Sequence, residues 1–304
     1  MRVKQNCKIN LGLKVYNQRT DGFHDIESVF SLINIFDYLT FKKEKEQILV
    51  YCKGIEKQDN IVYKTALLFR NTYHINSGVK IKIKKNIPVG AGLGGGSADA
   101  AATIKALNKF WKVNLTEKEM IDFATKIGSD VPFFIRNKTA YVTGRGEKVH
   151  PLDTNILIDV LLYKPDFSFS TKEIYQEYTY DSNDKNNIKE VVDGIKENDI
   201  RKISFNIKND LENSIIKNKD YKKYIDATRN DFIENKALCF SVTGSGSAVF
   251  GIFESKNYLK QARFQLIKKG YNKNSLFICK VGNIKWEKRF YFFVIAIKKI
   301  VWYN

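Results

Sequence analysis

The sequence predicts a protein of mixed helices and strands in two domains. Its 304 residues are about twice the usual length of one domain, so one large domain or two medium ones are expected. Residues 79–84 alternate apolar and basic side chains with a period of two, which is typical of a strand with one buried face. From Ser97 onward the period becomes helical, and a cluster of glycines lies between the two patterns.

The helix after the glycines is predicted from Ala100, Ile104, Leu107 and Trp111. These residues are spaced by four, three and four positions, so a helix would place them on one face. The glycine cluster is therefore expected to join the end of a strand to the beginning of a helix.

The second half of the chain repeats the mixed pattern. Apolar runs at 156–162 and 248–253 predict strands, and a helical region is expected from 185 to 194. The turn-prone residues 149–153 are the preferred domain boundary. The predicted units are an N-terminal domain, 1–152, a C-terminal domain, 153–283, and an appended basic and apolar tail, 284–304.

Composition indicates a folded protein of a reducing compartment. The chain is 43% hydrophobic and 28% charged, with only 4 prolines, which excludes a collagen-like or wholly disordered chain. Its four cysteines are far apart and only three histidines accompany them, so we expect reduced thiols rather than a zinc site or disulfides. The first residues contain no apolar signal core, which favours a cytoplasmic location.

The net charge of +18 allows several interpretations. The first 150 residues carry 25 Lys or Arg against 14 Asp or Glu, and the rest carry 26 against 19. A basic first half suits a polyanionic small ligand as well as it suits a nucleic acid or a membrane surface. Biased codon usage in a chain rich in Lys, Asn and Ile is an equally good explanation.

The glycine cluster predicts a phosphate-binding loop. Five of the seven residues from 90 to 96 are glycine, so the backbone can adopt positive φ and approach a ligand closely. The free N–H groups and the positive dipole end of the following helix attract an anion. A tight turn or linker is the structural alternative, but linkers seldom lie between such regular elements.

Two familiar phosphate loops fit this sequence poorly. A P-loop requires Gly-Lys followed by Ser or Thr, and this tripeptide is absent. Residues 90–95 do satisfy G-x-G-x-x-G, but a Rossmann first strand lies inside a parallel sheet and should be apolar on both faces. The lysines of 79–84 contradict that context.

The loop instead resembles the ATP-binding loop of the kinase superfamily of galactokinase, homoserine kinase, mevalonate kinase and phosphomevalonate kinase (GHMP kinases). The triple glycine before Ser-Ala-Asp-Ala-Ala is more specific and resembles kinases of 4-diphosphocytidyl-2-C-methyl-D-erythritol. Further similar segments follow in family order and cover roughly residues 4–283: Lys8 to Leu13, Arg19 to Ser28, Gly128 to Phe134, Asn209 to Glu212 and Thr243 to Ser247.

This resemblance implies an α+β fold of two domains, with the active site between them. The N-terminal domain would resemble domain 2 of ribosomal protein S5, and the C-terminal domain would be ferredoxin-like. The implied reaction is ATP-dependent phosphorylation of the 2-hydroxyl of 4-diphosphocytidyl-2-C-methyl-D-erythritol in the non-mevalonate pathway of isoprenoid biosynthesis. The alternatives are another GHMP-type kinase, acting on mevalonate or homoserine, and a basic RNA-binding protein without catalysis.

The resemblance assigns the chemistry to Lys8 and Asp130. Phosphoryl transfer needs a group that takes the acceptor's proton and a positive charge near the phosphoryl oxygens. Without the resemblance, Asp130 would be interpreted as a turn or N-cap aspartate, and Lys8 as a solvent-facing lysine. In a strand, Lys8 and Asn10 would share one face, and Asn10 is expected to help hold the acceptor.

Acceptor recognition is assigned to aromatic and polar side chains. Phe23 and Tyr175 would stack on the cytosine from its two sides, with His24 on the polar edge of the base. Taken alone, the two aromatic residues would be interpreted as core residues. Thr171, and Gly244 with Ser245 in a second flexible turn, complete the predicted acceptor site.

The nucleotide site is assigned to the glycine loop and its surroundings. Its predicted members are Pro88, Val89, Gly90, Ala91, Gly92, Leu93, Gly94, Gly95, Gly96, Ser97, Ala98, Lys85 and Asn60. Asp99 is expected to serve the loop and the first helical turn. ATP chemistry implies Mg²⁺. No carboxylate cluster marks a metal site and Ser97 is no more than a plausible ligand, so the metal ligands stay unassigned.

The tail contains an apolar run, residues 290–297, before two lysines. It is far shorter than the ~20 residues that span a bilayer, so no stable membrane insertion is expected. An appended strand or an unpacked terminus is favoured over contact with an anionic membrane. The predicted partner is a small-molecule substrate, and no nucleic acid is expected to bind. The sequence leaves the oligomeric state open.

Overall fold

The computed structural model describes residues 1–183 and 185–284. The prediction for the tail therefore falls almost entirely outside the described residues. The elements follow one another as β1 (Arg2–Gln18), β2 (His24–Glu44), β3 (Ile48–Cys52), η1 (Lys57–Asp59), α1 (Ile61–Thr72), β4 (Gly78–Lys84), α2 (Gly95–Phe110), α3 (Glu117–Ala124), α4 (Val131–Arg136), β5 (Ala140–Thr143), β6 (Lys148–Pro151), β7 (Leu157–Tyr163), α5 (Thr171–Gln176), α6 (Ile188–Glu197), α7 (Ile200–Asn206), α8 (Glu212–Ile215), α9 (Lys219–Glu234), β8 (Cys239–Val242), β9 (Val249–Phe253), α10 (Lys256–Lys268) and β10 (Leu276–Gly282).

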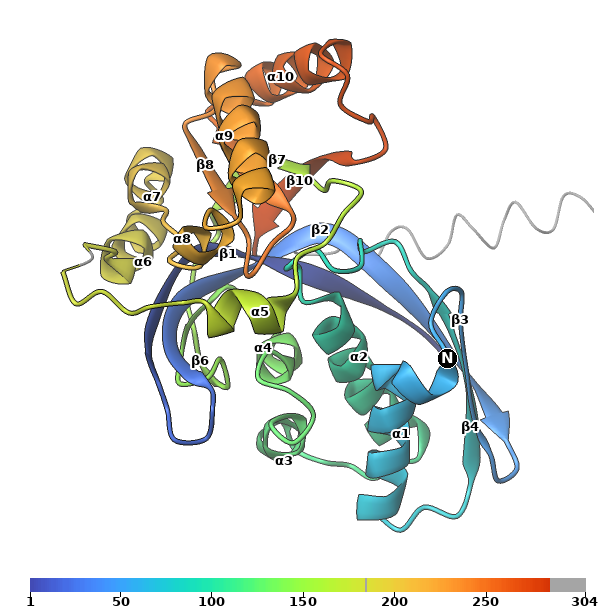
Figure 1. Cartoon of the computed structure of the whole chain (residues 1–304). Helices are drawn as coiled ribbons and strands as arrows, with labels where there is room; N and C mark the ends of the chain where they lie inside the picture. The colour runs from blue at the N-terminus through green and yellow to red at the C-terminus, as the bar shows by residue number, and fades with distance from the viewer. Residues whose placement is uncertain (184, 285–304) are drawn as a thin grey trace, which may run out of the picture.

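One continuous sheet runs through both halves of the described chain (Figure 1). Its main path has the strand order β3-β4-β2-β10-β7-β9-β8, while β1 and β5 also pair with β2, and β6 pairs with β5. Strand β2 is long enough to pair with β1, β4 and β5 along its length and with β10 at one position, Val281 opposite Ile33. The N-terminal and C-terminal halves are therefore joined through β2.

In the N-terminal half, helices cover one face of the sheet, as Figure 1 shows. Helix α2 packs against β1 and β2, and α1 packs against α2 and β3. The predicted strand is confirmed as β4: Val79 and Ile81 are fully buried, whereas Lys82 and Lys84 are exposed. The predicted helix is confirmed as α2, which begins two residues before Ser97.

In the C-terminal half, α9 and α10 pack against the strands β7 to β10. Both predicted strands are confirmed, as β7 and β9, with bounds that differ by one residue. The predicted helix is α6, but it begins at Ile188 rather than at residue 185. The side chain of Asn187 accepts a hydrogen bond from the N–H of Lys189 and thereby sets the first residue of the helix.

The prediction of a turn at 149–153 was wrong for most of that range, because residues 148–151 form the strand β6. Among the described strands it pairs only with β5, at the edge of the sheet, and Pro151 is its last residue. A proline is tolerated there, since no further strand needs its missing N–H. The division into domains at 152/153 stays a prediction.

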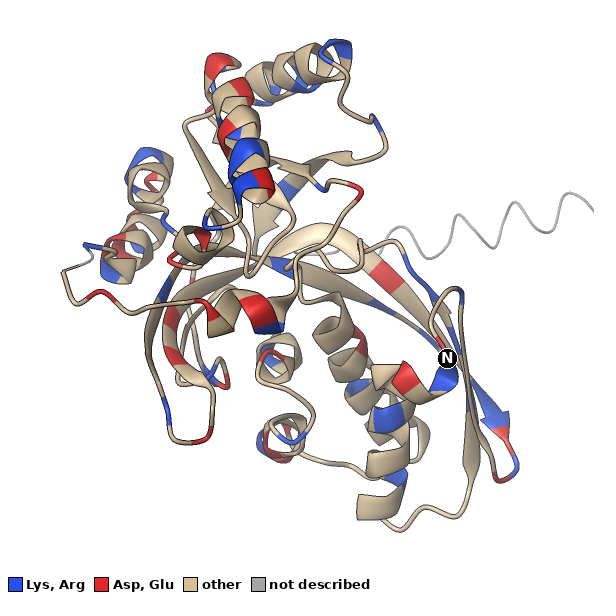
Figure 2. Cartoon of the chain, viewed as in Figure 1, with Lys and Arg blue, Asp and Glu red and all other residues tan. Residues whose placement is uncertain are grey.

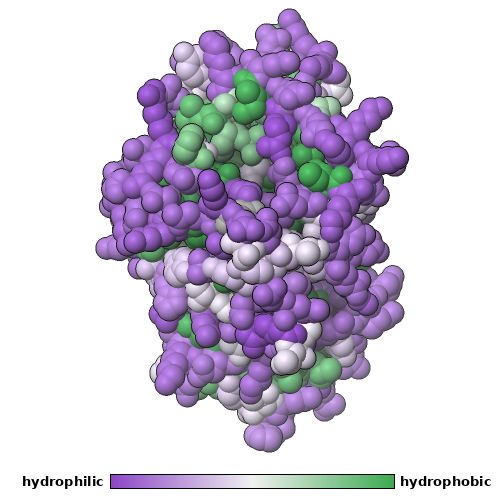
Figure 3. Space-filling model, turned by 60° about the vertical axis from the view of Figure 1, so that its left-hand side comes forward, coloured by the Kyte–Doolittle hydropathy of each residue, from purple (hydrophilic) through white to green (hydrophobic). Residues whose placement is uncertain are grey.

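The surface carries both signs of charge. Figure 2 shows Lys and Arg next to Asp and Glu along helix α9, so the C-terminal half is not uniformly basic. The face shown in Figure 3 is mostly hydrophilic, with hydrophobic side chains gathered in its upper part. Among the described residues, no helix is both long and apolar enough to cross a membrane.

Phe69 provides a test of the N-terminal core. Its side chain is fully buried and contacts the rings of Tyr73, Trp111 and Phe123 at centroid distances of 4.7, 6.0 and 5.3 Å. Phe69→Ala should lower the free energy of unfolding by ~3–5 kcal/mol, because it removes this packing and leaves a cavity. Leu68→Ala is the control, since Leu68 is 37% exposed. Chemical denaturation would contradict this description of the core if both variants lost the same stability.

Candidate active site

A cavity of about 910 Å³ lies between the two halves of the molecule. Its walls come from β1, β2, the glycine loop between β4 and α2, the start of α4, helix α5 and the turn between β8 and β9. Of all the residues predicted for the site, only Ser97 and Ala98 do not line it. Ala98 is buried, and its N–H donates to the carbonyl of Gly94 within the helix.

The glycine loop has the backbone that its composition predicts. Gly90, Gly92 and Gly94 all have φ between 63° and 71°, and Gly94 is the N-cap of α2. Helix α2 therefore begins at the cavity wall with the N–H groups of its first turn unpaired by the helix. Such an end attracts an anion such as a phosphate.

The turn between β8 and β9 packs directly on this loop. A Cβ atom at Gly92 would lie 2.0 Å from the carbonyl oxygen of Thr243, so only glycine fits at this position. Asn209 supports the turn from behind, donating from Nδ2 to the carbonyls of Val242 (2.9 Å) and Gly244 (2.8 Å). Asn209, which belongs to one of the segments that resemble the family, therefore supports the turn.

Lys8 is buried, contrary to the solvent-facing alternative. Its side chain is 4% exposed, and its Nζ donates to Asn10 Oδ1 at 2.7 Å and to the Gly92 carbonyl at 3.2 Å. The same Nζ lies 3.8 Å from Asp130 Oδ2. Burial lowers the pKa of Lys8, and the Asp130 carboxylate opposes that shift. The predicted catalytic pair is thus brought together across 122 positions of sequence.

Asp130 does not act as a helix cap. It occupies the N-cap position of α4, but its side chain makes no capping hydrogen bond. Its carboxylate is 29% exposed and lines the cavity beside Lys8. The position explains why a turn or cap aspartate was the ordinary interpretation, and the side-chain direction favours a chemical role.

The other end of the cavity is aromatic. Phe23 is 50% exposed, which excludes the core interpretation for this residue. The rings of His24 and Tyr175 have centroids 5.6 Å apart, and Tyr175 is partly buried. Burial, reinforced by the charge of Asp130, raises the pKa of Tyr175, and both side chains line the cavity.

Helix α5 connects this aromatic end to the second glycine turn. The hydroxyls of Thr171 and Ser245 are hydrogen-bonded at 2.7 Å, and Thr171 is the first residue of the helix that carries Tyr175. Three of the predicted acceptor residues therefore form one connected wall.

Sequence reasoning missed Arg145 and Asp37. Arg145 lines the cavity, and its guanidinium carbon lies 4.8 Å from the centroid of the Phe23 ring. It lies between Gly144 and Gly146, both with positive φ, so the pattern Gly-Arg-Gly was an available signal for a tight turn. Asp37 is completely buried and bonded to Lys85; no motif marks it within the long strand β2.

The nucleotide candidates Asn60 and Lys85 lie in the wall near the apolar side chains of Ile55, Ile61 and Ile83. Asn60 caps α1, accepting from the N–H of Val62 at 2.9 Å. Among the described residues, no three His, Cys, Asp or Glu side chains gather to hold a metal ion.

Comparisons with known proteins decide the family. The model of the GHMP kinase N-terminal domain matches residues 60–138, and that of the C-terminal domain matches residues 191–272. A 4-diphosphocytidyl-2-C-methyl-D-erythritol kinase of Caldanaerobacter subterraneus is 43% identical over 275 residues, covering 88% of this chain and 92% of the relative. The chain belongs to this family of GHMP kinases. The kinase of the same name from Clostridioides difficile is 38% identical, with the same two coverages.

Solved structures confirm the GHMP kinase fold. A crystal structure of 4-(cytidine 5′-diphospho)-2C-methyl-D-erythritol kinase has a TM-score of 0.77 at 24% identity and covers 93% of this chain and 99% of that one. Homoserine kinase from Cytophaga hutchinsonii has a TM-score of 0.64 at 19% identity, covering 92% of this chain and 94% of that one. The predicted α+β fold is therefore correct, and the chain is an ATP-dependent kinase.

Gly92 provides a test of the contact between the two loops. Gly92→Ala should weaken ATP binding about 10-fold or more, because the new methyl group must push the loop away from Thr243. Gly128→Ala is the matched control, since its Cβ would lie 3.6 Å from Val131, its φ is not positive and it does not line the cavity. Titration of each folded variant with ATP measures its affinity for ATP. If Gly92→Ala and the control bind ATP equally well, the phosphate site lies elsewhere.

Proposed function

We propose that this kinase transfers the γ-phosphoryl group of ATP to the 2-hydroxyl of 4-diphosphocytidyl-2-C-methyl-D-erythritol, in the cytoplasm. The observation that supports this most is the juxtaposition, in one cavity, of the Lys8–Asp130 pair with an exposed aromatic ring and a histidine. The relatives bear the name of this activity, and the chain covers nine-tenths of their length.

Asp130 takes the proton of the acceptor hydroxyl as that oxygen attacks the γ-phosphorus. The Lys8 ammonium, 3.8 Å from the carboxylate, orients the hydroxyl and stabilises charge on the phosphoryl oxygens. Because Lys8 also donates to the carbonyl of Gly92, its position relative to the phosphate loop is fixed. Asn10 accepts from Lys8 and so helps to hold the ammonium where the acceptor meets ATP.

The phosphates of ATP lie along the glycine loop, residues 88–96, against the first N–H groups of α2. Asn60 and Lys85 flank the nucleotide in the wall with the apolar side chains. Mg²⁺ enters with ATP as a counterion of its phosphates. Ser97 does not line the cavity, so no protein ligand is assigned to the metal.

The aromatic end suits a cytosine. Nδ1 of His24 lies 2.7 Å from the carbonyl oxygen of Tyr16, so this nitrogen carries the hydrogen and donates it. In the neutral ring Nε2 is then an acceptor, which matches the exocyclic amine of cytosine. Phe23 and Tyr175 offer ring faces for stacking, and Arg145 beside Phe23 offers a guanidinium to the diphosphate.

The rival functions lack such a match. Mevalonate and homoserine contain no base, so an acceptor of that kind would leave the exposed ring of Phe23 unused. An RNA-binding protein would not need a lysine buried beside a carboxylate. Measuring ADP release with a panel of acceptor alcohols tests the proposal directly. Turnover of mevalonate or homoserine, with none for the cytidylyl acceptor, would overturn it.

The catalytic assignment predicts the behaviour of two variants. Asp130→Asn and Lys8→Ala should each lower kcat by ~10²-fold or more, because a positioned base or a charge stabiliser is lost. ATP affinity should stay largely intact. Asp122→Asn, at an exposed carboxylate of α3, serves as the control and should keep full turnover. Near-native kcat in either site variant would remove that residue from the mechanism.

The base site predicts a selective loss. Phe23→Ala should raise the KM for the cytidylyl acceptor on the order of 5- to 150-fold, the value of stacking on one aromatic face, and leave the KM for ATP unchanged. Phe23→Tyr keeps the ring and should be nearly silent. Steady-state kinetics with both substrates, together with the melting temperature, distinguish the outcomes. Equal damage to both KM values in a destabilised Phe23→Ala protein would refute the stacking role.

A further inference from the structure

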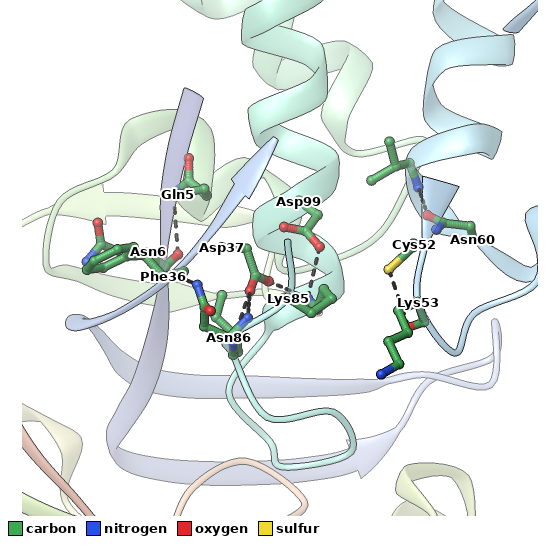
Figure 4. A network of polar contacts seen from close by, with 12 residues as sticks. Gln5, Asn6, Phe36, Asp37, Cys52, Lys53, Asn60, Lys85, Asn86 and Asp99 are labelled. Carbon is green, nitrogen blue, oxygen red and sulfur yellow. Dashed lines mark hydrogen bonds and ion pairs between the residues drawn. The ribbon is translucent and has the colours of Figure 1, made fainter. Parts of the chain in front are cut away.

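Lys85 joins two buried carboxylates beneath the phosphate loop. Its Nζ donates to Asp37 and to Asp99, the latter at 2.9 Å, and its side chain is only 18% exposed. Asp37 is 0% exposed and Asp99 is 3% exposed. Figure 4 shows the two carboxylates approaching Lys85 from β2 and from α2. Asp37, Lys85 and Asp99 are called the Lys85 cluster below.

The cluster holds the first residues of the loop. Oδ1 of Asp37 accepts hydrogen bonds from the backbone N–H groups of Asn86, at 2.5 Å, and of Ile87, at 2.9 Å. Its other oxygen accepts from Lys85. One carboxylate on β2 therefore binds three consecutive residues at the point where β4 ends and the chain turns toward the glycines.

The cluster also holds the other end of the loop. Asp99 lies in α2, four positions after Gly95 where the helix begins. Burial, opposed by the Lys85 ammonium and reinforced by Asp37, raises the pKa of Asp99 to about 7. Oδ1 of Asp99 is buried and accepts no hydrogen bond in the described structure. Burying a carboxylate with one unpaired oxygen costs free energy, and the ion pair between Asp99 and Lys85 offsets that cost.

We infer that Asp37 and Asp99 are positioning residues for ATP binding, which act by fixing the two ends of the phosphate loop through Lys85. The loop runs out from β4 and returns into α2, and its shape depends on the separation of these ends. Two of the three donors of the Lys85 ammonium are used within the cluster. The contribution of Lys85 to ATP binding is then mainly the geometry of the loop. This inference rests on the proposed placement of the phosphates.

A direct contact between Lys85 and ATP makes a different prediction. If Lys85 touched the nucleotide and Asp37 only neutralised it, loss of Lys85 would weaken ATP binding and loss of the Asp37 charge would not. If the cluster acts as a unit, removing any member releases the same constraint. The effects of two substitutions would then not add, as is usual for residues in one network.

The experiment is a double-mutant cycle with Asp37→Asn and Lys85→Met, read out as the Kd for ATP in the absence of acceptor. Each single variant, and Asp99→Asn, should raise this Kd on the order of 10-fold, the effect of losing one charge-assisted hydrogen bond. The double variant should bind ATP about as well as Lys85→Met alone. The KM for the acceptor should not change in any of them.

Asp231→Asn is the matched control. Asp231 is 6% exposed and accepts from Lys269 and from the hydroxyl of Tyr271, so it is a buried, paired carboxylate that does not line the cavity. This variant should lose stability and keep its affinity for ATP. An equal rise in Kd in Asp231→Asn would show that global stability, and not the loop, is responsible, and would overturn the inference.

The inference would also be overturned if the effects of Asp37→Asn and Lys85→Met on the Kd for ATP were additive. Native ATP affinity in both Asp37→Asn and Asp99→Asn would overturn it as well. Should Asp37→Asn fail to fold, the cycle of Asp99→Asn with Lys85→Met carries the same test. Gly92→Ala separates this failure from failure of the proposed function. If that variant weakens ATP binding while the cluster variants do not, the phosphate site stands and only the role of the cluster is wrong.

Discussion

The contact between the two glycine loops sets the geometry of the cleft. The loop before α2 and the turn after β8 belong to opposite halves of the molecule, and they meet where Gly92 has no room for a side chain against Thr243. Strand β1 passes beneath this contact: Lys8 donates to the carbonyl of Gly92, and the N–H of Asn10 donates to the hydroxyl of Thr243. Lys8, the lysine proposed to be catalytic, is therefore fixed relative to both loops at once.

Strand β1 carries more buried polarity than packing alone would favour. As whole residues, Gln5, Asn6, Lys8 and Asn10 are each at most 3% exposed, and their neighbours Ile9 and Leu11 are buried in the core. Taking an ammonium out of water costs several kcal/mol unless it is paired and hydrogen-bonded. Lys8 has Asn10, Gly92 and Asp130 around it, which offsets that cost. A position that violates the ordinary burial rule in this way is expected where function requires it.

Local patterns in the sequence were enough to predict the elements that flank the site. The alternation in β4 and the spacing of Ala100, Ile104 and Leu107 predicted a strand, a loop and a helix correctly, because these signals depend only on neighbours in the chain. The site itself depends on distant contacts. Periodicity could not show that Lys8 is buried, since its partner Asp130 is remote in sequence, and family resemblance supplied that pairing. Asp37 had no signal of either kind, because one polar residue in a long strand resembles any other.

The wall proposed to recognise the acceptor also borders the proposed catalytic pair. Helix α5 carries Tyr175 toward His24 at the aromatic end, and its first residue, Thr171, is hydrogen-bonded to Ser245 in the turn that packs on the glycine loop. Asp130 and Tyr175 line the same cavity. A base stacked at this end would therefore restrain the same helix that borders the reacting groups. Binding energy from a remote part of the acceptor would then hold its hydroxyl in place for transfer. That binding energy would raise the rate of transfer and not only the affinity for the acceptor.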